Sequence, residues 1–155
     1  MPSFRNERRV RHRPEQMFDL VADIESYPQF VPLCTATRVR NRRPDAHGRE
    51  TLLSEMSVGY KVIRETFTTR VVLDKPRLRI LVEYIDGPFR HLENVWTFRE
   101  EGDPNRSIVT FFIDYEFRSR ALGALMGSMF DAAFRKFSQA FEERANKIYS
   151  GKGAF

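Results

Sequence analysis

The sequence has a single cysteine, Cys34, among its 155 residues. One cysteine excludes an internal disulfide, which is typical of proteins kept in a reducing compartment. No apolar run approaches the roughly 18 residues that a membrane-spanning helix needs, and residues 1–7 lack the apolar core of a signal peptide. We therefore expect a cytoplasmic protein that at most contacts the inner face of a membrane as a peripheral protein.

Motifs of catalytic and metal sites are also missing. The three histidines, His12, His47 and His91, do not have the spacing of a zinc-binding pair. The chain has no phosphate-binding glycine loop, dinucleotide fingerprint or nucleophile elbow. Cys34 has no histidine near it in the sequence, and we interpret it as a buried, inert thiol. We predict no metal, no catalytic cofactor, no catalytic residue and no enzymatic activity.

Lysine is scarce beside arginine: five of the 26 basic residues are lysines, and the net charge is +5. The planar guanidinium group suits phosphate partners. Arg38, Arg40 and Arg42 alternate along one predicted strand and would share a face of the sheet. This stripe either meets phosphates of lipid or RNA, or keeps an exposed sheet face soluble.

Aromatic residues, in contrast, are abundant, with 14 phenylalanines, five tyrosines and one tryptophan. They either fill the core or line a cavity for a large apolar ligand. The chain length suits one domain with one core. We therefore predict a single domain over residues 1–150, followed by a frayed tail at 151–155.

Hydrophobic periodicity and turn residues divide the chain into ten elements. The predicted strands are 3–12, 35–42, 49–58, 61–73, 77–85, 90–99 and 107–118, and the predicted helices are 14–23, 24–30 and 120–149. Turns are expected at Gly59 and at 102–105, among others. The broad apolar stripe of the last helix needs a concave partner. The fold class is α+β: a helix-grip arrangement in the order β-α-α-β6-α, with a curved antiparallel sheet of about seven strands around the long C-terminal helix.

Successive hairpin turns of a meander lie alternately at the two ends of the sheet. The order of the predicted turns therefore shows which segments share one end, where a cavity could open. Segments 27–32, 58–60, 86–90 and 121–130 converge on one rim. They are rich in apolar residues, which either form an entrance or close the core at that end. Segment 121–130 has no charged residue and two helix-weakening glycines, which makes it our candidate lid.

A ligand in this gap would contact residues of both the rim and the concave face of the sheet. The predicted contact residues are Phe30, Pro32, Val58, Tyr60, Phe67, Phe89, Leu92, Asn94, Trp96, Phe111, Tyr115, Leu122, Leu125, Met126, Met129 and Phe130. Strand alternation turns Asn94 inward with Leu92 and Trp96, and turns His91 and Glu93 outward. Asn94 would either hydrogen-bond a ligand carbonyl or be satisfied by the backbone.

Three motifs on the rim carry a family resemblance. Tyr27-Pro28-x-Phe30-Val31-Pro32-x-Cys34, Val58-Gly59-Tyr60 with Glu65-x-Phe67, and Gly87-Pro88-Phe89-Arg90-His91-Leu92-Glu93-Asn94-x-Trp96-x-Phe98 resemble the coenzyme Q-binding protein family. That family belongs to the START-like, polyketide-cyclase-like superfamily. The resemblance covers residues 3–148, and its first and third motifs together are specific.

The resemblance implies a hydrophobic tunnel that binds ubiquinone as a ligand and a carrier or chaperone role that supports respiratory electron transport. The implied partners are an isoprenoid quinone and, transiently, a membrane surface. Bacterial relatives described as toxins that bind ribosomal subunits supply the alternative, a ribosome- or RNA-binding protein that inhibits translation. An enzyme of the cyclase type would need an inward-facing acid–base pair, and the sequence offers no clear one. The oligomeric state is not indicated.

Overall fold

The computed structural model describes residues 3–150, so the predicted tail at 151–155 lies outside the described part. The elements, in order, are β1 (Ser3–Val10), α1 (Pro14–Ala22), the 3-10 helix η1 (Ile24–Gln29), β2 (Cys34–Pro44), β3 (Arg49–Tyr60), β4 (Ile63–Asp74), the 3-10 turn η2 (Lys75–Arg77), β5 (Arg79–Asp86), β6 (Phe89–Glu101), β7 (Asp103–Phe117), α2 (Arg120–Ala145) and the π-turn η3 (Asn146–Ser150).

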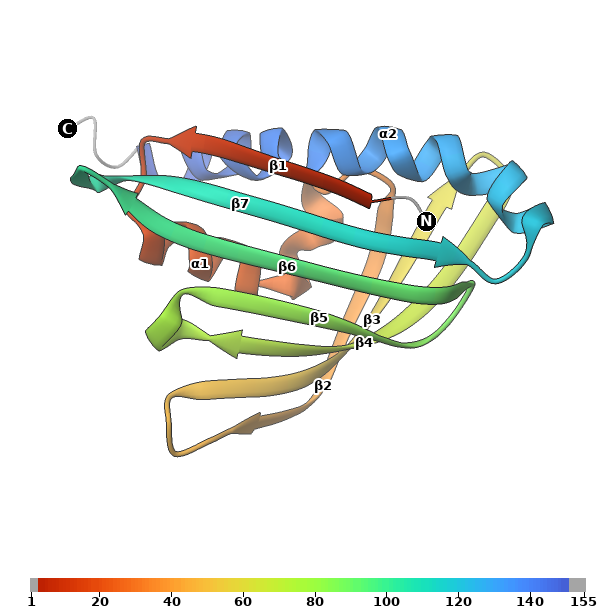
Figure 1. Ribbon diagram of the computed structural model, residues 1–155, viewed down its shortest axis with the longest axis horizontal. Helices are drawn as coiled ribbons and strands as arrows, with labels where there is room; N and C mark the ends of the chain where they lie inside the picture. The colour runs from red at the N-terminus through yellow and green to blue at the C-terminus, as the bar shows by residue number, and fades with distance from the viewer. Residues whose placement is uncertain (1–2, 151–155) are drawn as a thin grey trace.

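The seven strands form one antiparallel sheet in the order β1-β7-β6-β5-β4-β3-β2. The sheet curves, and α2 runs along it while α1 and η1 fill the space beneath β6 (Figure 1). Residues of α2, α1 and the inner strand faces share one apolar core. This arrangement confirms the predicted helix-grip fold, including its element order.

Local chemistry explains where the two α-helices begin. Pro14 occupies the first turn of α1, where its missing N–H is not needed. The backbone N–H of Arg13 donates to Oε1 of Gln16 at 3.0 Å. At α2, the Ser119 hydroxyl accepts from the backbone N–H of Leu122 at 3.2 Å, which is an N-cap. The predicted helix over 120–149 is confirmed, and its last turn changes from the α-helix α2 to the π-helix η3 after Ala145.

The turn predicted at Gly59 is wrong by two residues. The chain reverses at Lys61 and Val62, between the paired residues Tyr60 and Ile63. Gly59 serves a different purpose: a Cβ there would lie 2.8 Å from a guanidinium nitrogen of Arg64. That nitrogen donates to the carbonyl oxygen of Lys61 at 3.0 Å. The glycine therefore makes room for an arginine that ties down the hairpin.

The turn predicted at 102–105 is confirmed at Gly102 but is shorter than predicted, because β7 already begins at Asp103. Pro104 is tolerated in the strand since the pairing of β6 with β7 shifts between Glu100–Ser107 and Glu101–Asp103. Prolines are found at such bulges because no ladder hydrogen bond is lost there. Only Gly102 remains as the connection.

The predicted stripe of Arg38, Arg40 and Arg42 does not extend to Arg42, because β2 contains a bulge after Arg40. Asn41 adopts φ +58°, and the pairing with β3 shifts between Arg40 and Arg43. The Arg40 guanidinium group forms an ion pair with the Glu55 carboxylate, with 2.8 Å between nitrogen and oxygen. Arg42 turns instead toward η1, where it pairs with Glu25 at 3.3 Å and with Glu50 at 3.1 Å. The bulge therefore breaks the alternation on which the stripe depended.

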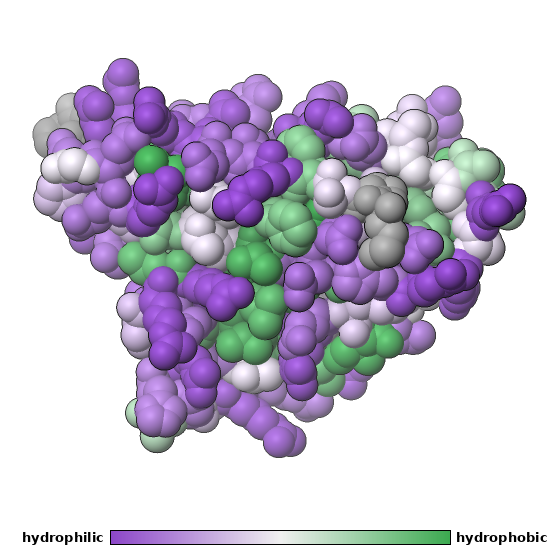
Figure 2. Space-filling model, in the orientation of Figure 1, coloured by the Kyte–Doolittle hydropathy of each residue, from purple (hydrophilic) through white to green (hydrophobic). Residues whose placement is uncertain are grey.

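On the outer face of the sheet, an apolar row crosses four strands. Val72, Leu81, Val95 and Phe112 are directly opposite one another in register from β4 to β7. All four are half-buried. Figure 2 shows a band of apolar side chains over β5, β6 and β7 with polar residues on both sides. Cross-strand apolar pairs of this kind stabilise a sheet.

Candidate functional site

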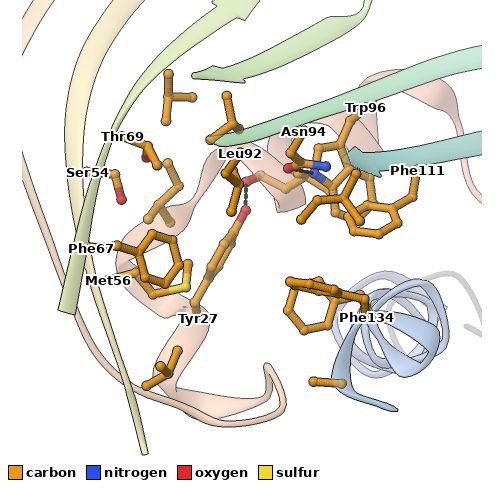
Figure 3. Close-up of a pocket in the computed structure, with 18 of the residues that line it drawn as sticks. Tyr27, Ser54, Met56, Phe67, Thr69, Leu92, Asn94, Trp96, Phe111 and Phe134 are labelled. Atoms are coloured by element: carbon orange, nitrogen blue, oxygen red, sulfur yellow. Dashed lines mark hydrogen bonds between the residues drawn. The ribbon is translucent and has the colours of Figure 1, made fainter. Parts of the chain in front are cut away.

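The concave face of the sheet, α1, η1 with the segment that follows it, and α2 line a cavity of about 90 Å³. Figure 3 shows side chains from all of these elements pointing into it. The lining residues are Val21, Ile24, Tyr27, Pro32, Leu33, Ser54, Met56, Val58, Phe67, Thr69, Val71, Ile80, Val82, Leu92, Asn94, Trp96, Phe111, Ile113, Phe130, Ala133, Phe134, Phe137 and Phe141. None of them is charged, and most are aliphatic or aromatic.

Two of the four strongly polar lining side chains, Asn94 and Tyr27, are occupied by the protein itself. The Asn94 amide donates to the carbonyl oxygen of Phe112 at 2.8 Å and accepts from the indole N–H of Trp96 at 3.1 Å. The Tyr27 hydroxyl donates to the carbonyl oxygen of Val21. Burial raises the pKa of Tyr27 well above its usual value, so the phenol stays neutral. Both side chains are fixed in place before any ligand arrives.

The other two, Ser54 and Thr69, are directly opposite each other on β3 and β4. They are 3% and 4% exposed. Figure 3 places them together on a wall of the cavity away from Asn94 and Trp96. Neither hydroxyl forms a hydrogen bond with any residue in the part of the chain that the structure describes.

An aromatic cluster around Phe89 closes the cavity at the end where β6 begins. The Phe89 ring lies 5.6 Å from Phe67 and 5.7 Å from Phe130, both of which line the cavity. Phe117 stacks on its other side at 5.0 Å. Gly87 permits this closure, since its φ of +144° and a Cβ distance of 2.5 Å to Phe67 leave no space for a side chain.

At the same end, the molecule exposes apolar side chains to solvent. Tyr60 is 45%, Val62 95%, Ile85 51% and Leu125 64% exposed. They lie on the β3–β4 hairpin, at the end of β5 and in the first turns of α2, which Figure 1 shows gathered at one end of the molecule. Val62 and Ile85 were not among the residues predicted from the sequence, although their exposure follows from the positions of the strand ends once the β3–β4 hairpin is correctly placed.

The predicted contact residues divide into two groups. Those that line the cavity are Pro32, Val58, Phe67, Leu92, Asn94, Trp96, Phe111 and Phe130. Those that do not line it are Phe30, Tyr60, Phe89, Tyr115, Leu122, Leu125, Met126 and Met129. Most of this second group packs in or against the core and closes the rim, whereas Tyr60 and Leu125 face solvent. Sequence reasoning missed the hydroxyls of Ser54 and Thr69. The available signal was alternation, which groups Ser54 with Leu52 and Met56, and Thr69 with Phe67 and Val71.

The candidate lid, segment 121–130, is only partly free of the core. Met126 is 1% exposed and Phe130 3%, so both are held in the core. A Cβ at Gly127 would meet no atom within 4 Å, and at Gly123 only the Phe117 ring, at 3.9 Å. Close packing therefore does not account for either glycine.

The remaining titratable candidates lie outside the cavity. His91 is 3.0 Å from Asp114, and Glu93 is exposed, both on the outer face as predicted. His12 is buried against Asn146, with 2.7 Å between Nε2 and Oδ1. Cys34 is buried, and desolvation raises the pKa of its thiol to about 11. Among residues 3–150, no group of three or more His, Cys, Asp and Glu side chains has the geometry of a metal site.

A curved antiparallel sheet that grips a long helix, with an apolar cavity between them, defines the START-like class of domain. The family described as "Polyketide cyclase / dehydrase and lipid transport" matches residues 10–142, and the chain belongs to this family. The resemblance drawn from the rim motifs is thereby confirmed at the level of the superfamily.

Relatives carry two kinds of name. The chain is 33% identical over 151 residues to the ribosome association toxin RatA of Rickettsia prowazekii, covering 96% of this chain and 99% of that protein. It is 30% identical over 138 residues to the mitochondrial coenzyme Q-binding protein COQ10 homolog B of Xenopus laevis, covering 87% of this chain and 54% of that protein.

Among solved structures, an 18 kDa protein of Caulobacter crescentus is 36% identical, with a TM-score of 0.78 and coverage of 97% of this chain and 99% of that one. A Streptomyces aromatase/cyclase has a TM-score of 0.73 at 16% identity and so shares the fold. No helix within the described residues is both long and apolar enough to cross a membrane.

Proposed function

We propose that this protein binds a neutral isoprenoid lipid, with ubiquinone as the preferred ligand. It would carry this lipid as a chaperone in support of respiratory electron transport. The observation that carries the proposal is an apolar cavity between the sheet and α2 without one charged side chain in its lining. The choice of a quinone draws on the relatives named as coenzyme Q-binding proteins.

The absence of charge in the lining selects among lipid classes. Burying a carboxylate or phosphate without a partner is strongly unfavourable. A fatty acid or phospholipid head group would find no lysine, arginine or histidine within this cavity. A quinone head group is neutral and needs only hydrogen-bond donors, which hydroxyl groups can provide. The lining therefore favours a quinone over a charged lipid.

Burial of the tail supplies enough free energy for a carrier. Two isoprene units bring about ten carbons, and burying them contributes roughly 8 kcal/mol. This corresponds to a dissociation constant near micromolar before the costs of ordering are subtracted. Pockets for ligands of this size usually measure about 300–1,000 Å³. The cavity of about 90 Å³ must therefore widen when a quinone enters.

Loading and release require contact with a membrane, and the rim is suited to it. The exposed apolar side chains gather at the end of the cavity that Phe89 closes. Exposed apolar patches that surround a pocket are typical of lipid or protein contact sites. We propose that this rim touches the bilayer transiently while the lipid passes.

A carrier rather than an enzyme is favoured by the state of the polar groups. The Asn94 amide is held by Phe112 and Trp96. The raised pKa of Tyr27 makes its phenol a poor proton donor near neutral pH. The lining contains no acid–base pair of the kind that a cyclase would need.

Organic extraction of the purified protein, followed by mass spectrometry and a redox-difference ultraviolet spectrum, tests this proposal. We expect a near-stoichiometric quinone. An empty extract, together with no uptake of added quinone by the purified protein, would contradict the proposal.

A second function, ribosome binding that inhibits translation, is favoured by a specific observation. The chain spans 99% of the toxin of Rickettsia prowazekii but 54% of the coenzyme Q-binding relative. Phosphate contacts would make co-sedimentation with ribosomal subunits weaken steeply with salt. Arg40 and Arg42 are paired with carboxylates, so the exposed Arg38 and Arg43 are the better targets for glutamate substitution. If the double variant Arg38→Glu/Arg43→Glu binds ribosomal subunits as well as the wild type, β2 does not contact the ribosome.

A further inference from the structure

We propose that Ser54 and Thr69 form the polar anchor of the cavity and select ligands that carry a hydrogen-bond-accepting carbonyl oxygen. The inference rests on the proposed lipid-binding function and assigns the end of the ligand that is recognised. Both residues line the cavity and are more than nine-tenths buried. Neither hydroxyl has a hydrogen-bond partner within the described chain.

The position of the two hydroxyls makes them a pair rather than two isolated groups. Ser54 and Thr69 are register partners on adjacent antiparallel strands. Side chains directly opposite each other have Cβ atoms about 5 Å apart. Two hydroxyls at this separation can both donate to one ligand oxygen, because each hydroxyl rotates to suit its partner.

The same two strands contain a second serine–threonine pair, in which the two hydroxyls bond to each other. Ser57 and Thr66 are also register partners, and their hydroxyl oxygens are 2.9 Å apart, so each satisfies the other. They face solvent rather than the cavity. At Ser54 and Thr69 no hydrogen bond joins the two hydroxyls, and both residues line the cavity. A ligand oxygen would satisfy both.

The other polar side chains of the cavity do not compete for this role. The Tyr27 hydroxyl donates its only proton to Val21. The Asn94 amide is held by Phe112 and Trp96. Since the lining has no charged group, a neutral carbonyl at this wall of the cavity would meet two hydroxyl donors side by side.

The test uses two planar probes with the same four methyl groups, one with carbonyl oxygens and one without. Duroquinone carries four ring methyl groups and two carbonyls, and durene is the hydrocarbon with the same four methyl groups. Equilibrium dialysis measures their binding to the wild type, to the double variant Ser54→Ala/Thr69→Val, and to the control Ser57→Ala/Thr66→Val. Thermal unfolding of each variant establishes that it is folded.

We expect the wild type to bind duroquinone more tightly than durene. The cavity variant should lose about tenfold in affinity for duroquinone, as expected for two neutral hydrogen bonds, and bind durene at least as well as before. The control variant should bind both probes like the wild type. Wild-type affinity for duroquinone in the cavity variant would overturn the anchor while leaving the carrier function in place. Failure of the wild type to bind either probe would overturn both.

Discussion

At the scale of single residues, Cys34 shows how burial sets chemistry. Its thiol is 7% exposed and lies 3.9 Å from the carbonyl oxygen of Ala36. Desolvation of the thiolate raises the pKa from 9.0 to about 11. The thiol is therefore protonated near neutral pH, and the thiolate is the form that reacts. This residue belongs to the core even though it stands next to the rim.

We predict that iodoacetamide alkylates Cys34 about 100-fold more slowly in the folded protein at pH 8 than in urea, because the thiolate fraction falls tenfold per unit of pKa. Mass spectrometry of the alkylated fraction over time measures the ratio. Since the folded state holds the proton more tightly, the free energy of unfolding should be unaffected below pH 9.0 and should fall as pH rises from there to about 11. Equal alkylation rates would show that the thiol is exposed.

The face of the sheet to which a side chain points could be predicted from the alternation of apolar and polar residues. The inward position of Asn94 and the outward position of His91 follow from it. The hydrogen bonds of a buried side chain could not, because they depend on strands distant in the sequence. Asn94 is held by Phe112, which lies 18 residues away on β7. Likewise, nothing in the strand 49–58 indicates that Ser54 lacks a partner whereas Ser57 has one.

At the scale of elements, the first half of α2 combines a buried anchor with weak helix propensity. Met126 holds it to the core, while Gly123 and Gly127 have open space where a side chain would stand. Glycine inside a helix lowers stability by about 1 kcal/mol relative to alanine. The helix is therefore easier to unwind near the rim than near its C-terminal end, as a widening cavity requires.

We predict that Gly127→Ala raises the free energy of unfolding by about 1 kcal/mol and slows the release of a bound quinone. Urea denaturation and stopped-flow transfer to vesicles measure the two effects. The matched control, Ala132→Gly, lies at an exposed position farther along α2 and should lower stability by a similar amount without changing release. A stabilised Gly127→Ala variant with wild-type release would show that α2 does not unwind during exchange.

Element types and their order could be predicted because they follow from local periodicity and turn residues. The errors fall where long-range contacts decide. Gly59 reads as a turn residue, but its space is taken by the Arg64 side chain. The bulge at Asn41 depends on pairing with β3, and its one mark in the strand sequence is an asparagine, a residue that adopts a positive φ more readily than most.

At the scale of the whole molecule, apolar exposure is concentrated at one end. The large exposed hydrophobic residues of the described chain are Tyr60, Val62, Ile85 and Leu125. Lys61, Arg64, Arg118 and Arg120 lie on the same hairpin and at the start of the same helix. Basic residues near an anionic bilayer contribute about 1 kcal/mol each, and apolar side chains at the tip can enter the interface. The Arg64 contact to Lys61 keeps the hairpin in shape.

We predict that Val62→Asp lowers the partition of the protein onto vesicles of phosphatidylcholine and phosphatidylglycerol by about tenfold or more, because an apolar side chain leaves the interface and a like charge enters it. Flotation of the vesicles measures the bound fraction. The control, Ala46→Asp, places the same charge on an exposed turn at the opposite end of the sheet and should have a much smaller effect.

The wild type should also bind more weakly as salt rises and on vesicles of phosphatidylcholine alone, since the basic residues act through screened attraction. Uptake of a short-chain quinone from solution should be unchanged in Val62→Asp, because Val62 does not line the cavity. If the Val62 and Ala46 variants float equally well, the rim is not the membrane contact, and the lipid must enter the cavity by another route. If Val62→Asp instead loses both vesicle binding and quinone uptake, the hairpin helps to form the binding site itself.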